Sequence, residues 1–128
     1  DLEASKQEVI IESPFITSER MQTFWPVFSK LLKRKVRIYV MTRDPREHTP
    51  EYEEQSEVEI QRMETEGIQV LLCIGNHHRK LVMVDREILW EGSLNILSQI
   101  RSREFMRRLE GGGFAVDLFN FLAYESLL

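Results

Sequence analysis

The sequence predicts an α/β fold in which a mixed β-sheet is flanked by helices on both faces. Apolar, strand-like segments alternate with segments of helical periodicity in the first half of the chain, and a run of strand-like segments follows in the second half. The length of 128 residues fits one domain and is enough to bury a hydrophobic core. We therefore expect a single domain over residues 1–128 and, because the chain lacks an initiator Met, one excised from a larger protein.

The first elements are two strands with a helix between them. Glu8–Glu12 is short and apolar at its centre, as a buried strand is, and Lys35–Thr42 alternates polar and apolar residues before it becomes apolar. Between them, Met21–Leu32 carries apolar residues at helical spacing. Pro26 lies inside this span, where it either marks the first turn of the helix or kinks it.

A second helix and a third strand complete the alternating half. Glu51–Glu66 predicts an exposed, acidic helix that ends at Gly67. Its thin apolar stripe consists of Val58, Ile60 and Met63. The apolar segment Ile68–Ile74 is the third strand, and Gly75-Asn76 is a turn. This strand contains the only cysteine, Cys73, which we expect to be a buried, unreactive thiol.

The second half of the chain is predicted to be rich in strands. Arg79–Val84 and Glu87–Glu91 are two strands joined tightly through Asp85-Arg86, and Glu104–Leu109 is a further strand. Phe114–Leu128 carries apolar residues at helical spacing, so we expect a closing helix that packs against the sheet.

The composition excludes some classes of function. A net charge of −4 argues against attraction of nucleic acid by the whole surface, although local basic clusters remain available. These clusters are Lys30, Lys33, Arg34, Lys35 and Arg37, and Arg101, Arg103, Arg107 and Arg108. We find no apolar stretch long enough to cross a bilayer and no amphipathic anchor. Because one cysteine cannot form an internal disulfide, the cytoplasm is the expected compartment.

The segment NHHRKLVMVDREILWEGSLN carries the residues of a phosphate-handling site. On a strand, His78 and Lys80 would point the same way, because side chains two apart share a face. The lysine would neutralise phosphate oxygens while the histidine, neutral near pH 7, attacks phosphorus. Ser93 and Asn95 offer a hydroxyl and an amide to phosphate oxygens, and Gly92 lets the backbone come close.

This segment resembles the motif of the phospholipase D superfamily. The family pattern is His-x-Lys-x4-Asp, followed after six intervening residues by Gly-Ser-x-Asn. The residues that match it are His78, Lys80, Asp85, Gly92, Ser93 and Asn95. Ile11–Ile16 (IESPFI) is similar to the N-terminal strand and loop of nuclease-like members, and the resemblance spans about Val9–Arg108.

The resemblance implies a role for each residue. His78 would attack phosphorus and form a covalent phosphohistidine. The phosphate oxygens would be held by Lys80, Ser93 and Asn95. Glu104 stands where the family often carries a late acidic residue, and it would fix the tautomer of His78 by accepting a hydrogen bond from the other imidazole nitrogen. Asp85 and Gly92 are expected to be structural residues at the site.

The chain departs from the family in the number of motifs. The family's site uses two copies, one histidine as nucleophile and the other as general acid, whereas this chain carries one copy. His77 is no substitute, because neighbouring residues on a strand point to opposite faces, and we expect it to be solvated. We therefore predict a homodimer whose two His78 side chains share one site, with Trp90 and Leu94 among the candidate contact residues.

The sequence thus predicts a metal-independent phosphodiesterase that uses no cofactor and acts as an endonuclease on nucleic acid, with DNA preferred to RNA. No metal is expected, because Lys80 already supplies positive charge to the phosphate and no zinc-ligand spacing is present. Two alternatives stay open. One is a phospholipase or phospholipid transferase, and the other is a catalytically silent module for nucleic-acid binding and dimerisation.

Overall fold

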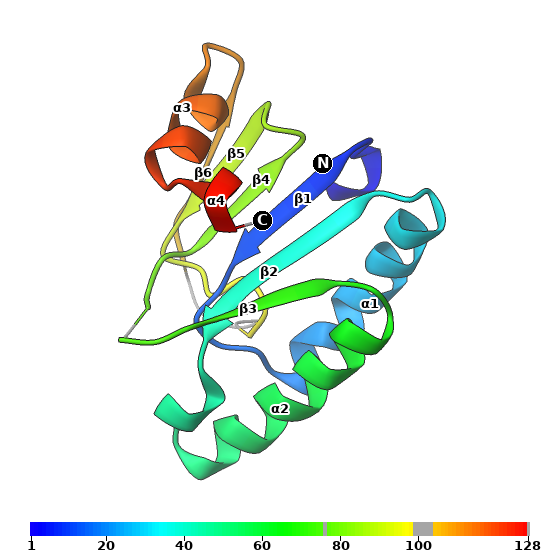
Figure 1. Cartoon of the computed structure of the whole chain (residues 1–128), viewed down its shortest axis with the longest axis vertical. Coiled ribbons are helices and arrows are strands. Elements are labelled where there is room, and N and C mark those ends of the chain that lie inside the picture. Colours follow the sequence, from blue (N-terminus) through cyan, green and yellow to red (C-terminus); the bar gives the residue numbers. More distant parts are fainter. Residues whose placement is uncertain (76, 99–103, 128) are drawn as a thin grey trace.

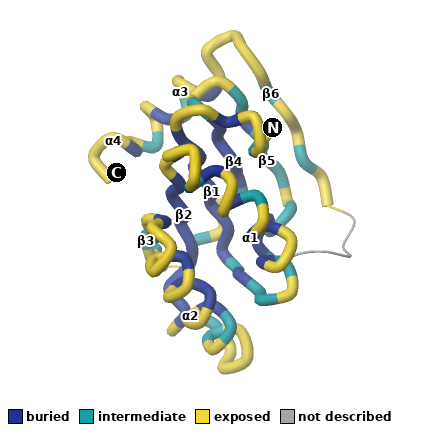
Figure 2. Tube along the Cα trace, turned by 90° about the vertical axis from the view of Figure 1, so that its right-hand side faces the viewer, coloured by how far each residue is buried: buried dark blue, intermediate teal, exposed yellow. Residues whose placement is uncertain are grey.

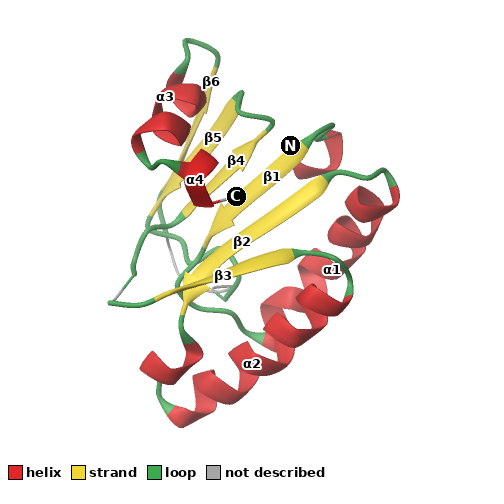
Figure 3. Ribbon diagram, in the orientation of Figure 1, coloured by secondary structure: helices red, strands yellow, loops and turns green. Residues whose placement is uncertain are grey.

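The computed structural model describes residues 1–75, 77–98 and 104–127, which form one mixed sheet of six strands with helices on both faces (Figures 1 and 3). The predicted fold class is therefore confirmed. The strands are β1 (Glu8–Glu12), β2 (Arg37–Arg43), β3 (Gln69–Cys73), β4 (Leu81–Val84), β5 (Ile88–Gly92) and β6 (Met106–Glu110). The helices are α1 (Ser18–Lys33), α2 (Pro50–Thr65), α3 (Phe114–Phe121) and α4 (Tyr124–Leu127), and short 3₁₀ turns occupy Leu2–Ala4 and Pro45–Glu47.

The strand order decides which loops lie together. The strands follow the order β3-β2-β1-β4-β5-β6. The β1, β2 and β3 strands are parallel, whereas β4 is antiparallel to β1, β5 to β4 and β6 to β5. Consequently, the carboxyl ends of β1, β2, β3 and β5 meet the amino ends of β4 and β6 at one edge of the sheet.

Two hydrophobic clusters hold the helices on the sheet. The α1 and α2 helices pack on one face, where Val9 and Ile11 of β1 contribute to the core, and α3 and α4 pack on the other face, where Ile10 contributes. This alternation follows from the pleat of a strand that is covered on both sides. Burial is concentrated in the central strands, while much of the surface of β6 and α3 is exposed (Figure 2).

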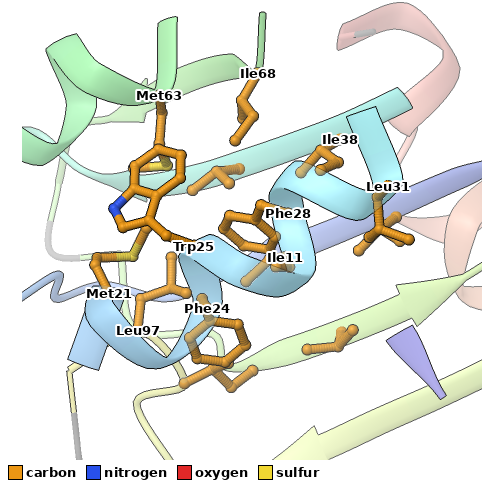
Figure 4. Packing of buried hydrophobic residues seen from close by; sticks show 14 of the residues in the cluster. Ile11, Met21, Phe24, Trp25, Phe28, Leu31, Ile38, Met63, Ile68 and Leu97 are labelled. Carbon is orange, nitrogen blue, oxygen red and sulfur yellow. The ribbon is translucent and has the colours of Figure 1, made fainter. Parts of the chain in front are cut away.

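The α1 helix supplies most of the aromatic core. It begins at Ser18 after Thr17, whose hydroxyl accepts a hydrogen bond from the Arg20 amide, and Pro26 lies within the helix rather than in its first turn. Its buried face consists of Met21, Phe24, Trp25, Phe28 and Leu31 (Figure 4). The apolar residues predicted from helical spacing over Met21–Leu32 include all five, and Leu32 is only partly buried.

The α2 helix corrects one part of the predicted stripe. Ile60 and Met63 are buried as expected, but Val58 is 58% exposed. Val58 lies only two residues from Ile60, so the two side chains leave the helix in very different directions. The buried face is completed by Ser56 and Glu59, whose side chains bond to the Ile16 carbonyl and to the Trp25 indole.

Several boundaries also differ from the prediction. The β2 strand begins at Arg37 rather than Lys35, because Lys35 has a positive φ of 63° and belongs to a turn. The predicted C-terminal helix is two short helices, since Ala123 adopts a φ of 55° between Phe121 and Tyr124. Of the predicted features, Asn76, Arg101, Arg103 and Leu128 lie outside the described residues.

Candidate active site

The candidate site lies at the edge where the strand ends meet. Residues 77–80 form an irregular segment directly before β4, so the expected strand start at Arg79 is two residues too early. His78 is exposed, and the ammonium of Lys80 donates a hydrogen bond to the His78 carbonyl at 2.6 Å. The two side chains line one hollow of about 470 Å³ together with Gly92, Phe105, Arg107 and Phe121, among others.

Arg43, the last residue of β2, contacts the imidazole of His78. Its Nη2 atom lies 2.8 Å from Nε2 of His78 and 3.4 Å from Nδ1. These two distances place Nη2 over the face of the ring rather than in line with the electron pair of Nε2, so a cation lies against the imidazole without selecting its tautomer. Sequence reasoning missed Arg43.

The surroundings of His78 favour its neutral form. Desolvation lowers the pKa of His78, and the charges of Arg43, Lys80 and His77 lower it further. Each of these effects penalises the imidazolium. Near pH 7, His78 therefore has a free electron pair to offer, which a nucleophile requires.

His77 is the point at which the prediction from sequence was wrong. It was expected to be solvated, but its side chain is only 10% exposed, and its Nε2 lies 2.7 Å from Oε1 of Glu12, the last residue of β1. Hydrogen bonding with Cys73 and with Glu12 raises the pKa of His77 to about 9, against the desolvation that lowers it. His77 is thus a cation paired with a buried carboxylate. Cys73 itself is half-buried, not fully buried.

Glu12 connects three parts of the chain beneath the site. Its side chain is fully buried, it accepts hydrogen bonds from Arg79 Nε at 3.0 Å and from the hydroxyl of Tyr124 in α4, and it pairs with His77. Burial raises the pKa of Glu12, but His77, Tyr124 and Arg79 outweigh it, so the net pKa lies below the usual value. The carboxylate therefore anchors both neighbours of His78 in the sequence.

Asp85 has a structural position at the opposite end of β4. Its carboxylate accepts hydrogen bonds from the backbone amides of Lys6, Gln7 and Glu8 at 2.8–2.9 Å. Desolvation raises the pKa of Asp85, but these three bonds outweigh it and leave the pKa below its usual value. Asp85 and Arg86 both have positive φ angles in the turn between β4 and β5, so this residue ties the hairpin to β1.

Gly92 and Ser93 hold the start of β6 against the end of β5. A Cβ atom on Gly92 would lie 1.9 Å from the carbonyl oxygen of Phe105, so only glycine fits there without a backbone shift. The Ser93 amide donates to the same carbonyl at 2.8 Å, and the Ser93 hydroxyl accepts from the Phe105 amide at 2.9 Å. Gly92 thus permits a close backbone approach, but the approach is by Phe105.

Asn95 and Glu104 lie on the segments that follow. Asn95 lines a small hollow of about 200 Å³ with Phe15, Thr17, Tyr52 and Ser98. The centroid of the Phe15 ring lies 5.2 Å from the guanidinium carbon of Arg43. Glu104 is exposed, two residues before β6, and its hydrogen bond to His78 stays a prediction.

The described ranges hold neither a metal-binding group nor a membrane-spanning helix. Residues 1–75, 77–98 and 104–127 bring no three His, Cys, Asp or Glu side chains together as a metal-binding group. In the same ranges, none of the helices has both the length and the apolar character needed to span a membrane.

Comparison with known proteins adds a family and a fold. Residues 1–105 match the family model described as "Cardiolipin synthase, PLD-like domain". No curated protein matches the chain. The fold is similar to that of Nuc from Salmonella typhimurium, described as a phospholipase D family member, with a TM-score of 0.71 and 15% identity over 94% of this chain and 78% of Nuc.

Two other solved structures share the fold. NucT from Helicobacter pylori has a TM-score of 0.67 and 12% identity, over 94% of this chain and 79% of NucT. The phosphatidylserine synthase of Haemophilus influenzae has a TM-score of 0.63 and 14% identity, over 94% of this chain but only 32% of the synthase.

Proposed function

The chain is a PLD-like domain and belongs to the phospholipase D superfamily, and from this premise we propose that it is a phosphodiesterase that cleaves nucleic acid through a covalent phosphohistidine on His78. Lys80, Ser93 and Asn95 hold the phosphate oxygens in this proposal, and Glu104 orients the imidazole. DNA is the preferred substrate, with RNA as the second, and neither a metal nor a cofactor takes part.

The environment of His78 is the observation that carries the proposal. The imidazole is exposed at the rim of a hollow, lies beside Lys80, and contacts the guanidinium of Arg43. A neutral imidazole with an accessible electron pair, next to cations that attract a phosphate, is suited to attack on phosphorus.

One motif per chain leaves the leaving oxygen without an acid. In the attack, the Nε2 electron pair of His78 forms a bond to phosphorus, the bond from phosphorus to the leaving oxygen breaks, and that oxygen takes a proton. The attacking imidazole cannot supply this proton on the far side. We therefore propose a homodimer that acts with one His78 neutral and the other protonated: the protonated imidazole of the second copy is the acid, and water later cleaves the phosphohistidine with that imidazole as base.

The choice of nucleic acid over lipid rests on the motif and on size. The single motif, the IESPFI segment and the match over most of the length of Nuc and NucT indicate a compact, single-motif enzyme. The family description and the Haemophilus synthase favour phospholipid transfer as the second candidate. Turnover of labelled DNA, RNA and phosphatidylglycerol vesicles by the same preparation distinguishes the two.

Hydrolysis of bis(p-nitrophenyl) phosphate tests the chemistry. We expect His78→Ala to abolish hydrolysis and Lys80→Ala to be nearly as severe, while both variants keep the wild-type unfolding transition. Lys33→Ala, which removes a lysine at the end of α1, is the matched control and should retain activity. An acid-labile phosphoryl group should be trapped on His78. Wild-type turnover by His78→Ala would show that the proposal is wrong, and absence of any turnover would favour the silent binding module.

Activity across a dilution series, combined with sedimentation, tests the shared site. Activity per chain should fall in step with the dimer fraction. A stable monomer with undiminished activity per chain contradicts the shared site, unless another protein is shown to supply the second histidine.

A further inference from the structure

Two exposed phenylalanines line the hollow that contains His78 and Lys80. Phe105, directly before β6, is 65% exposed, and Phe121, the last residue of α3, is 84% exposed. The α3 helix packs beside β5 and β6 (Figure 1), so one phenylalanine reaches the hollow from a helix and the other from the sheet. Single exposed apolar side chains are ordinary on a protein surface, but two large rings in one hollow with a candidate nucleophile indicate a binding surface.

The charges around the hollow indicate what it binds. Among the described residues that line it, Arg79, Lys80 and Arg107 are cations and Glu91 is the carboxylate. Glu91 pairs with Arg107, and Arg79 pairs with the buried carboxylate beneath the site. The ammonium of Lys80 bonds to the neutral carbonyl of His78, and that bond does not compensate its charge. The hollow therefore combines a positive charge with aromatic rings.

A nucleic-acid strand fits this combination better than a second copy of the chain does. In a two-fold dimer the same patch meets itself, so a dry contact over the two rings would bring Lys80 and its neighbours against their own copies. Like charges that face one another in an interface are costly. In the shared site a phosphate would lie between them. A polynucleotide supplies that phosphate and also offers flat bases to the rings.

The position of the rings restricts the form of the nucleic acid. His78 lines the same hollow, so a phosphate held there has its neighbouring base close to Phe105 and Phe121. In a duplex, each base is paired and stacked on its neighbours, and turning one out is costly. An unpaired base offers its face to an aromatic ring without that cost. The rings therefore favour single strands.

We propose that Phe105 and Phe121 form a base-stacking subsite beside His78, which makes unpaired nucleotides the preferred substrate of this domain. The phosphate lies at His78 and Lys80, and the base next to it lies against the rings. Because every base has a flat face, the subsite selects the form of the strand and not its sequence. This inference rests on the proposed function, because it names the substrate class of the same site.

Fluorescence anisotropy with three end-labelled probes tests the subsite without turnover. The probes are an oligothymidylate of about 12 nucleotides, an abasic strand of the same length and charge, and a duplex of that length. All chains carry His78→Ala, so the probes stay intact. We expect the oligothymidylate to bind most tightly. Phe121→Ala should weaken its binding by roughly 5–100-fold, as loss of a stacking ring does, and leave binding of the abasic strand unchanged.

Matched variants separate stacking from other uses of the ring. Phe121→Leu keeps an apolar side chain but loses the flat face, so it should bind as weakly as Phe121→Ala, whereas Phe121→Trp should bind like the parent. Phe105→Ala should add to the loss. Phe114→Ala is the control and should bind like the parent, because Phe114 is 51% exposed in α3 but is not among the described residues that line the hollow.

Two results would overturn the subsite. Parent-like affinity of Phe121→Leu for the oligothymidylate would mean that the apolar area of the ring matters and its flat face does not. Sedimentation gives the other: if Phe121→Ala dissociates a dimer and loses affinity for the abasic strand as well, the ring lies between two copies of the chain.

Cleavage by chains with an intact His78 separates the failure of this inference from the failure of the proposed function. We expect the wild-type chain to cleave single strands faster than duplex, and Phe121→Ala to reduce that ratio. If the wild type cleaves no phosphodiester, the proposed function fails, while the three probes still decide whether the subsite exists. If the wild type cleaves DNA but Phe121→Ala leaves both the ratio and the affinities unchanged, the inference fails and His78 keeps its role.

Discussion

Replacement of His77 by glutamine should change how the stability of the fold depends on pH. The pKa of His77 rises from 6.5 to about 9 in the folded chain, so folding binds a proton that the unfolded chain releases above pH 6.5. Because the pKa is raised on folding, the proton on His77 stabilises the folded state fully at pH values below the pKa of the unfolded chain. This stabilisation is lost as pH rises through the pKa of the folded chain. At about 1.4 kcal/mol for each pKa unit, the contacts of His77 with Cys73 and Glu12 together contribute up to roughly 3 kcal/mol below pH 6.5. This is a large fraction of the roughly 5–15 kcal/mol that stabilises a typical domain.

Urea unfolding at pH values from 6 to 9.5 measures this contribution. The wild-type free energy of unfolding should fall by up to roughly 3 kcal/mol between pH 6.5 and 9, whereas His77→Gln should be less stable at pH 6 and nearly flat over that window. Cys73→Ser should also reduce the slope, because the hydrogen bond with Cys73 is the largest cause of the raised pKa of His77. Parallel profiles for wild type and His77→Gln would refute the assignment of a buried cation to His77.

Three further predictions concern Asp85 in the turn between β4 and β5, Gly92 at the end of β5, and the effect of removing metal ions. Asp85→Asn should destabilise the chain by roughly 1.5–3 kcal/mol at pH 7, as measured by urea unfolding. The difference in free energy of unfolding from wild type should disappear as pH falls through the depressed pKa of Asp85. Asp117→Asn, at an exposed position, should leave the stability unchanged. Gly92→Ala should cost at least roughly 1–3 kcal/mol, since its Cβ meets the Phe105 carbonyl, and a stability equal to wild type would contradict that contact. Phosphodiester hydrolysis should persist in excess EDTA; full loss that magnesium restores would indicate a metal-dependent enzyme.

The elements that the sequence predicted well are those whose pattern is local. The face of α1 from Met21 to Leu31 recurs at helical spacing, and the β1 strand is apolar along its centre, so neither needed knowledge of distant residues. The α2 helix was harder, because its buried face includes Ser56 and Glu59. Hydrogen bonds with the Ile16 carbonyl and the Trp25 indole offset the cost of burying these polar side chains. Both partners are more than thirty residues away, so no local sequence pattern indicates them.

In the site, too, the residues of the local motif could be predicted from the sequence, whereas their distant partners could not. The motif placed His78, Lys80 and Asp85, but it did not indicate Arg43, whose charge lowers the pKa of His78, or Glu12, which pairs with His77 beside it. Glu12 and Arg43 are single polar residues at the carboxyl ends of β1 and β2, and the partner of Glu12 in α4 is 112 residues away. One signal was available. Ligands bind outside the carboxyl ends of strands in open α/β sheets, so polar residues that end apolar strands deserve to be counted as candidates.

Two adjacent histidines of opposite protonation state explain how one segment serves both the fold and the chemistry. The buried carboxylate of Glu12 keeps His77 charged, while desolvation and the surrounding cations Arg43, Lys80 and His77 keep His78 neutral. The charge on His77 therefore acts twice: it neutralises Glu12 and it disfavours a proton on its neighbour. Environments that drive the pKa values of neighbouring groups apart commonly divide structural and catalytic roles between them. Exchange of the two roles would place an unpaired carboxylate in the core and a cation where an electron pair is needed, and this is the physical reason why His78, and not His77, is the candidate nucleophile.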